Sequence, residues 1–137
     1  MSQDDAVWAE TTDGGLLKQL FGYYPTLHDA VIRSIEIDRA SDRIEMVVDY
    51  SDMVGDDTNQ GMSVRIRLAW QGIQSFDLPL VDSDLHDLDF GRDENQIVTH
   101  LEVWPGVFGT VVSDTVEATL VQVDPGNDDQ TPWLRYK

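Results

Sequence analysis

Residues 62–70 alternate between apolar and polar side chains more regularly than any other part of the chain. One face of this segment carries Met62, Val64, Ile66, Leu68 and Trp70, whereas the other carries Ser63, Arg65 and Arg67. Side chains alternate between the two faces of a strand, and an antiparallel sheet commonly buries one face and exposes the other. The segment therefore predicts a half-buried strand in an antiparallel sheet.

The same pattern predicts further strands at residues 30–39, 44–50, 73–80, 97–104, 107–112 and 116–123. Within 44–50 the inward positions are Ile44, Met46, Val48 and Tyr50. The first strand is less regular, because Arg33 falls on the face that carries Val31, Ile35 and Ile37. A tight turn at residues 40–42 makes the first two strands a hairpin.

A short helix is predicted over residues 14–21, where Leu16, Leu17, Leu20 and Phe21 recur at helical spacing before Gly22. Residues 1–13 are predicted to be a loose start that docks through Trp8. Gln71 and Gly72 are expected to break the sheet, and Pro79 to end or bend the strand over 73–80. Loops are expected at 51–61, at 105–106 and at 125–129, and the tail at 131–137 is expected to pack back or pair as an edge strand. The acidic stretch at 81–95 is predicted to be a long loop or one short helical turn.

These elements predict a mostly β (α+β) protein with a curled or two-layer antiparallel sheet of six to eight strands and one short N-terminal helix. The 137 residues suit a single domain over 1–137. The chain has 26 acidic and 9 basic residues, a formal net charge of -17. This charge disfavours nucleic acid and anionic membranes as partners and favours a basic protein or a cation. The acids are spread along the chain, which is typical of a folded surface, and solubility alone also explains them.

The sequence has no cysteine, so disulfides, thiolate catalysis and cysteine-based zinc sites are excluded. The N-terminus is polar, and no apolar run is long enough to span a bilayer. A cytoplasmic protein is therefore expected. Serine residues lack the Gly-x-Ser-x-Gly pattern, and no glycine-rich phosphate loop is present. We therefore expect a protein that is not an enzyme and that has no cofactor.

Two Leu-His-Asp triplets occur, at residues 27–29 and 85–87. With His100 they raise the possibility of a divalent metal site, but their spacing matches no metal motif. On a strand His28 and Asp29 would point to opposite faces and could not chelate together. The competing interpretation is that they fix the turn before the first strand through side-chain to backbone hydrogen bonds. No metal site is predicted, and a small hydrolase that uses His28, His86 and Asp87 stays as an alternative.

The acidic stretch raises the alternative of a divalent-cation-binding domain whose carboxylates lie between Asp82 and Glu94. A calcium loop of the EF-hand type needs glycine at its sixth position and glutamate at its twelfth. Counted from Asp82, these positions hold Asp87 and Asp93, so the template fails. A solvated acidic segment is the simpler interpretation.

The segment around Tyr24 and Pro25, followed by His28-Asp29-Ala30 and Ser34, resembles the signature of the immunity protein 50 family of bacterial polymorphic toxin systems. The departures are Thr26 for serine, Leu27 for phenylalanine and Val31 for glutamate, and the match covers about a tenth of the chain.

The resemblance implies a small non-enzymatic protein that binds and neutralises a cognate toxin. An acidic inhibitor would be steered onto the basic cleft of a toxin that acts on nucleic acid. The interaction face and the oligomeric state stay open. The candidate motif and partner residues are Tyr24, Pro25, His28, Asp29, Ser34, Asp82, Asp84, Asp87 and Asp89.

Overall fold

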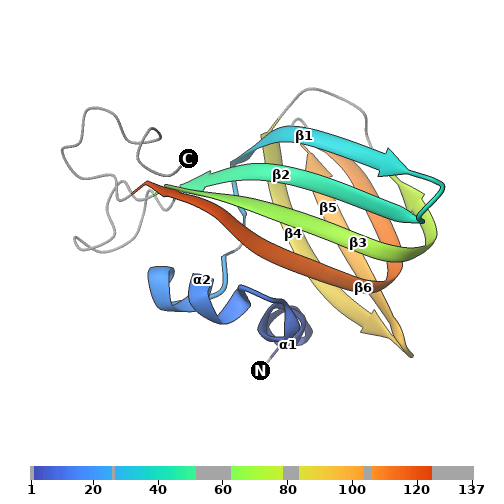
Figure 1. Ribbon diagram of the computed structural model, residues 1–137, viewed down its shortest axis with the longest axis horizontal. Helices are drawn as coiled ribbons and strands as arrows, with labels where there is room; N and C mark the ends of the chain where they lie inside the picture. The colour runs from blue at the N-terminus through green and yellow to red at the C-terminus, as the bar shows by residue number, and fades with distance from the viewer. Residues whose placement is uncertain (1, 26, 52–62, 79–83, 104–105, 125–137) are drawn as a thin grey trace.

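The six described strands form one antiparallel sheet that closes into a barrel (Figure 1). The computed structural model describes residues 2–25, 27–51, 63–78, 84–103 and 106–124. The elements are α1 (Gln3–Glu10), α2 (Gly14–Phe21), β1 (Ala30–Asp38), β2 (Arg43–Ser51), β3 (Ser63–Asp77), β4 (Asp84–Asp93), β5 (Gln96–Val103) and β6 (Val107–Asp124). Around the barrel the order is β1-β2-β3-β6-β5-β4. The predicted mostly β fold with a curled antiparallel sheet is confirmed.

The hairpin of β1 and β2 and the alternation of β2 and β3 are confirmed. Ile44, Met46, Val48 and Tyr50 point inward from β2, and Val64, Ile66, Leu68 and Trp70 point inward from β3. The two strands pair in unbroken register from Arg43 opposite Gln71 to Ser51 opposite Ser63. Strict alternation works here because neither β2 nor β3 carries an extra residue over this length: their register shifts against β1 and β6 place the extra residue on β1 and on β6.

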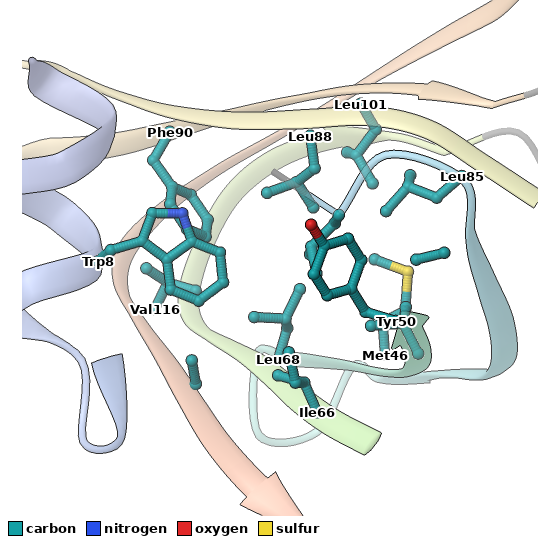
Figure 2. Packing of buried hydrophobic residues seen from close by; sticks show 14 of the residues in the cluster. Trp8, Met46, Tyr50, Ile66, Leu68, Leu85, Leu88, Phe90, Leu101 and Val116 are labelled. Atoms are coloured by element: carbon teal, nitrogen blue, oxygen red, sulfur yellow. The ribbon is translucent and has the colours of Figure 1, made fainter. Parts of the chain in front are cut away.

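The barrel interior is filled by apolar side chains from all six strands (Figure 2). β1 contributes through Ala30, Ile32 and Ile35. Leu85 and Leu88 from β4 and Leu101 from β5 face Met46 and Leu68 from the other side of the barrel. A buried polar contact also lies in the core, where the Trp70 indole donates to Thr99 Oγ1 at 2.8 Å. A barrel of this size has room for side chains but not for a channel.

Two predicted strand breaks are absent, and a β-bulge in β3 accounts for the first of them. β3 continues through Gln71 and Gly72 to Asp77, with Gly72 at a φ of 71° and a register shift between Ile73 and Ser75. The strands predicted at 107–112 and 116–123 are one strand, β6. A bulge bends a strand without ending it, so polar or glycine residues at the bend do not separate two elements.

β1 also carries a bulge, and this corrects its predicted faces. The register with β2 shifts between Ile32 and Ser34, so Ile32 and Ile35 pack against the core while Val31 and Ile37 are exposed. The shift also places Arg33 outside. The apparent conflict of an arginine on the apolar face therefore disappears once the extra residue is counted.

The prediction of a loop or helical turn over 81–95 is wrong for its described part, because Asp84–Asp93 is strand β4. A register shift between Leu85 and Asp87 separates the buried Leu85 and Leu88 by three positions. Spacing of three is typical of a helix, and the bulge thus hides the strand from a search for period two.

The expected loose start is an additional helix, α1. Ser2 caps it by accepting a hydrogen bond from the Asp5 backbone N–H at 3.1 Å. Trp8 docks as predicted: it is fully buried and meets Phe90 edge to face, with ring centroids 5.1 Å apart. Figure 1 shows α1 and α2 together outside the sheet, and α1 contacts β4. The predicted helix α2 is confirmed and ends at Gly22, whose φ is 84°.

Asp4 of α1 protects the edge of β4, since its Oδ1 accepts the Phe90 backbone N–H at 2.8 Å. Burial raises the pKa of the Asp4 carboxyl above its ordinary value of 3.8, the bond from Phe90 opposes this, and the nearby charges of Asp89 and Asp5 add to the rise. The folded protein thus holds this proton more tightly than the unfolded chain. The contribution of Asp4 to stability is present below the ordinary pKa and is lost as the pH rises through the raised value.

Asp4→Asn should therefore raise the melting temperature at neutral pH, because the amide oxygen can still accept the Phe90 N–H without carrying a charge. The gain should vanish as the pH falls towards 4, where the unfolded carboxyl of the parent also becomes protonated. Asp4→Ala is the matched variant: it leaves the edge N–H without this acceptor and should cost about 1–3 kcal/mol. Thermal unfolding between acidic and neutral pH measures both, and a gain that is independent of pH would contradict the assignment.

Several predictions fall outside the described residues: most of the 51–61 loop, Pro79, Pro105, the 125–129 loop and the tail at 131–137. The turn at Gly106 is described, with its N–H donating to the Val103 carbonyl at 2.8 Å. Among the described helices, none combines the length and the apolar character needed to cross a membrane.

Candidate functional site

The two histidines of the Leu-His-Asp triplets meet where the barrel closes. His28 lies in the turn before β1, and His86 lies at the bulge of β4. β1 and β4 pair through Ala30 opposite Leu85 and Val31 opposite Asp84. We call this short pairing the seam. Because antiparallel strands run past one another, the residues before β1 come to lie beside those that follow Leu85.

The turn that carries His28 has an unusual backbone. Leu27 has a φ of 58° and Asp29 a φ of 62°, a region that non-glycine residues rarely occupy. Leu27 is fully buried, and its carbonyl accepts the Ala30 N–H at 3.1 Å. The turn is therefore anchored by an apolar side chain and presents His28 and Asp29 to solvent.

The expectation that His28 and Asp29 point to opposite faces is wrong, because both lie in this turn and not in a strand. His28 Nε2 is 3.5 Å from Asp29 Oδ2. On the other side of the ring, Nδ1 is 2.7 Å from the His86 carbonyl oxygen. The expected side-chain to backbone hydrogen bond therefore exists, but it joins the turn to β4 across the seam.

His28, His86 and Asp87 form one cluster, in which each residue offers a ligand atom within 4.8 Å of the others. The two imidazole rings meet edge to face with centroids 4.8 Å apart. The cluster is open to water: the side chains of His28 and Asp29 are 50% and 74% exposed. Chemically it can bind a cation or accept hydrogen bonds from a partner, and its exposure provides none of the water exclusion that a catalytic site uses.

Next to this cluster lies a group of outward-facing side chains that we call the acidic wall: Asp87, Asp89, His100, Glu102 and Phe108. Asp89 lies opposite His100 on β5, and Asp87 lies opposite Glu102, which in turn faces Phe108 on β6. With Leu101 they line a hollow of about 250 Å³. Phe108 is 71% exposed, the largest value among the exposed large hydrophobic residues of the described chain. Exposed aromatic side chains amid polar residues are typical of binding surfaces.

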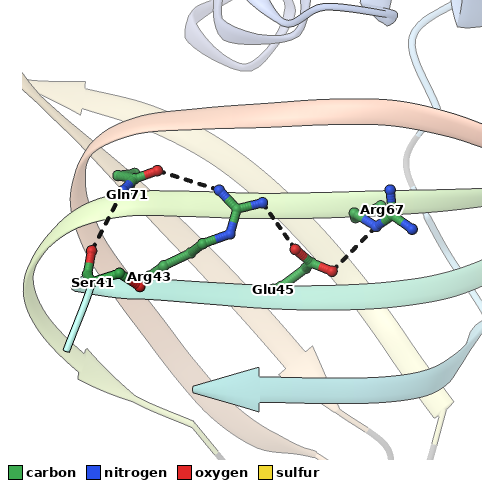
Figure 3. Close-up of polar contacts among 5 residues, drawn as sticks. All are labelled: Ser41, Arg43, Glu45, Arg67 and Gln71. Carbon is green, nitrogen blue, oxygen red and sulfur yellow. Dashed lines mark hydrogen bonds and ion pairs between the residues drawn. The ribbon is translucent and has the colours of Figure 1, made fainter. Parts of the chain in front are cut away.

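The opposite side of the barrel carries arginines. Figure 3 shows Arg43 and Arg67 on either side of Glu45, at 2.9 Å and 3.2 Å from its carboxylate oxygens. Arg65 and Arg33 share Asp49 in the same way, and the hydrogen bonds that Arg65 donates to Asp49 hold the pKa of Arg65 above its usual value. We call this group, on β1, β2 and β3, the arginine wall.

The two walls separate the charge of the molecule. In a barrel of six strands β2 lies opposite β5 and β3 opposite β4, and Figure 1 shows β4 and β5 behind β2 and β3. Four arginines of the arginine wall compete for two carboxylates. Among the ion pairs of the described residues, none involves Asp87, Asp89 or Glu102. Within the described residues, no lysine or arginine therefore pairs with these carboxylates of the acidic wall.

The structure brings some of the sequence candidates together and separates others. His28, Asp29 and Asp87 are at the cluster, Asp89 is in the acidic wall, and the exposed Asp84 begins β4 at the seam. Elsewhere, Pro25 is buried, Lys18 Nζ lies 5.0 Å above the Tyr24 ring, and Ser34 is exposed on β1. Asp82 lies outside the described residues.

Sequence reasoning missed Glu102 and Phe108 and did not include His86 among the candidate binding residues. Glu102 and Phe108 join Asp87 only through the register of three strands, which no local pattern contains. One signal was available: alternation over 107–112 places Phe108 on the face opposite the buried Val111. A phenylalanine on the outer face of a strand is a candidate contact residue.

No family model matches the chain, and no curated protein matches it. Among solved structures, the crystal structure of an uncharacterized protein from Neisseria gonorrhoeae is similar, with a TM-score of 0.46 and 8% sequence identity. That match covers 66% of this chain and 90% of the other.

Proposed function

We propose that this protein is a non-enzymatic binding protein that holds a basic protein domain against its acidic wall, and that this domain is a bacterial toxin. The observation that carries the proposal is the set of carboxylates around the exposed Phe108 that form no ion pair within the described part of the chain. Carboxylates without cationic neighbours attract a basic surface, and they accelerate its association by steering. An aromatic side chain at the centre supplies the apolar contact that charge alone lacks.

The distribution of charge favours the acidic wall over the arginine wall as the binding face. Exposed ion pairs contribute little to stability. The arginines matter here mainly because they neutralise the carboxylates of Glu45 and Asp49 on the same side of the barrel. With four arginines and two carboxylates the arginine wall is net positive, so the net charge of -17 arises from the rest of the chain. A basic partner that approaches the barrel meets attraction at β4 and β5 and like charge at β2 and β3.

The identity of the partner as a toxin rests on the resemblance of the segment around Tyr24, Pro25 and His28 to the immunity protein 50 family. A toxin that acts on nucleic acid needs a basic cleft to hold phosphates. A protein with a pI near 4.1 could occupy that cleft and exclude the nucleic acid. Neutralisation then needs affinity and geometry but no chemical step.

The proposal is tested by measuring the affinity of the full chain for the toxin domain encoded beside its gene. Asp89→Asn/Glu102→Gln should weaken binding roughly 10- to 100-fold, because close interfacial charge pairs contribute strongly and the loss is not replaced. Phe108→Ala should weaken it by about 30-fold if the ring is the central anchor. Calorimetry at low and moderate salt measures both.

A matched control removes the same charge from β1. Glu36→Gln/Asp38→Asn also neutralises two exposed carboxylates, and the amide oxygen at position 38 can still accept the Ala40 N–H that Asp38 binds at 3.0 Å. This variant should bind within a few-fold of the parent. Equal losses in both double variants would show that net charge acts without a specific face, and absence of binding at low salt would refute the proposed function.

A further inference from the structure

We propose that His28, His86 and Asp87 form a binding site for a divalent transition-metal ion such as zinc. The site adjoins the proposed partner contact and shares Asp87 with it, whereas Asp89, Glu102 and Phe108 belong to the partner contact alone. Its ligand atoms already lie within 4.8 Å of one another and come from two elements that the fold holds side by side.

The types of ligand select the ion. Two imidazoles and one carboxylate are donors that zinc, nickel, cobalt and copper accept, whereas calcium and magnesium prefer six or more oxygens. Three protein ligands leave a fourth tetrahedral position for water. Asp29, whose Oδ2 is 3.5 Å from His28 Nε2, lies close enough to occupy that position instead.

The hydrogen bond at His28 prepares the ring for this role. A carbonyl oxygen can only accept, so the 2.7 Å contact with the His86 carbonyl places the proton of His28 on Nδ1. In the neutral ring Nε2 then carries the lone pair. A histidine that binds a metal through Nε2 commonly donates its Nδ1–H to a backbone carbonyl, which fixes the ring orientation and the tautomer. Here the same peptide that orients His28 belongs to the second ligand.

Binding requires only a small contraction of the cluster. Zinc lies about 2.0–2.1 Å from imidazole nitrogen, so ligand atoms in a tetrahedron are about 3.3 Å apart. His28 and Asp87 are exposed and His86 is half-buried, so these side chains can rotate without repacking the core. The ion would also join the turn before β1 to β4 next to the two residue pairs of the seam. It should therefore stabilise the folded state, because the unfolded chain does not hold the three ligands together.

The test uses the full chain freed of any affinity tag, titrated with zinc by calorimetry and with cobalt by visible absorption. We expect about one equivalent of zinc, a tetrahedral cobalt spectrum and a melting temperature that rises with zinc concentration. His28→Ala, His86→Ala and Asp87→Asn should each weaken zinc binding by more than about 10-fold, because altering even a residue that only hydrogen-bonds to a metal ligand costs about that much. Circular dichroism of each metal-free variant checks that the fold is retained.

His100→Ala is the matched control, because it removes the third histidine of the chain from the neighbouring acidic wall. It should leave zinc binding within twofold. Zinc binding that survives both His28→Ala and His86→Ala, or that is lost with His100→Ala alone, would overturn the site. Calcium binding as tight as zinc binding would also overturn it, since carboxylates alone would then account for the affinity. No saturable binding of zinc or cobalt would overturn it directly.

Discussion

Replacing Trp8 with alanine should lower the free energy of unfolding by about 3–5 kcal/mol, the range found when a large buried aromatic side chain is removed. Trp8 is fully buried and stacks edge to face on Phe90 of β4. Figure 2 shows the indole between Phe90 and Val116, at the position where α1 meets the barrel interior. Its removal leaves a cavity that the short helix cannot fill, because α1 contributes only one other buried side chain, Val7.

Urea denaturation followed by far-ultraviolet circular dichroism measures this loss. Leu16→Ala on α2 is the control, because Leu16 is 43% exposed and its truncation should cost well under half as much. A cost below about 1 kcal/mol for Trp8→Ala would mean that α1 does not contribute to the cooperative core.

Gly14→Ala should destabilise the protein by about 3 kcal/mol, whereas Gly15→Ala should stabilise it by about 0.5 kcal/mol. A Cβ at Gly14 would lie 1.8 Å from the Trp8 carbonyl oxygen, a backbone atom that cannot move without displacing α1. A Cβ at Gly15 meets nothing within 4 Å, and alanine favours the helix. Alanine substitution at two adjacent glycines of the same helix should thus change the free energy of unfolding in opposite directions.

Thermal and chemical unfolding of the two variants side by side tests this pair. The parent and Gly15→Ala should also keep the same far-ultraviolet spectrum, while Gly14→Ala should lose helical signal if α1 separates from α2. Similar changes in both variants would contradict the close approach of the two helices at Gly14.

The core strands could be predicted because their sequence pattern is local. In β2 and β3 each residue from Ile44 to Tyr50 and from Val64 to Trp70 keeps the face that alternation assigns. Helix α2 was likewise predicted from its apolar spacing and from Gly22 at its end. Regular hydrogen-bonding registers preserve period two, and a single sequence is enough to show it.

Two features could not be predicted because a strand carries an extra residue: the inward face of β1 and the existence of β4. Bulges near Arg33 and His86 shift the inward side chains of β1 and β4 by one position, which removes the alternation. For α1 the pattern was too weak, because only Val7 and Trp8 of its eight residues are buried. Tertiary contacts of Trp8, and not local propensity, account for this helix.

The candidate site was predicted in its parts but not in its geometry. The sequence showed two His-Asp pairs, and His28 and His86 lie 58 positions apart. Their meeting depends on which strands close the barrel, and the pairing of β1 with β4 follows from no local signal. The contribution of Glu102 and Phe108 depends on the same global register.

The pairing of β1 with β4 at the seam is much shorter than any other strand pairing of the described barrel. β3 and β6 are paired through thirteen residue pairs, whereas in the described chain β1 and β4 share two. Local opening should therefore begin between β1 and β4, since fewer residue pairs are separated there than between any other two neighbouring strands of the described chain. All six strands would stay in one continuous curved sheet, joined by their other five pairings, while β1 and β4 are apart. A ligand that bridges β1 and β4 should suppress this opening, and slower hydrogen exchange of the nearby backbone amides would show it.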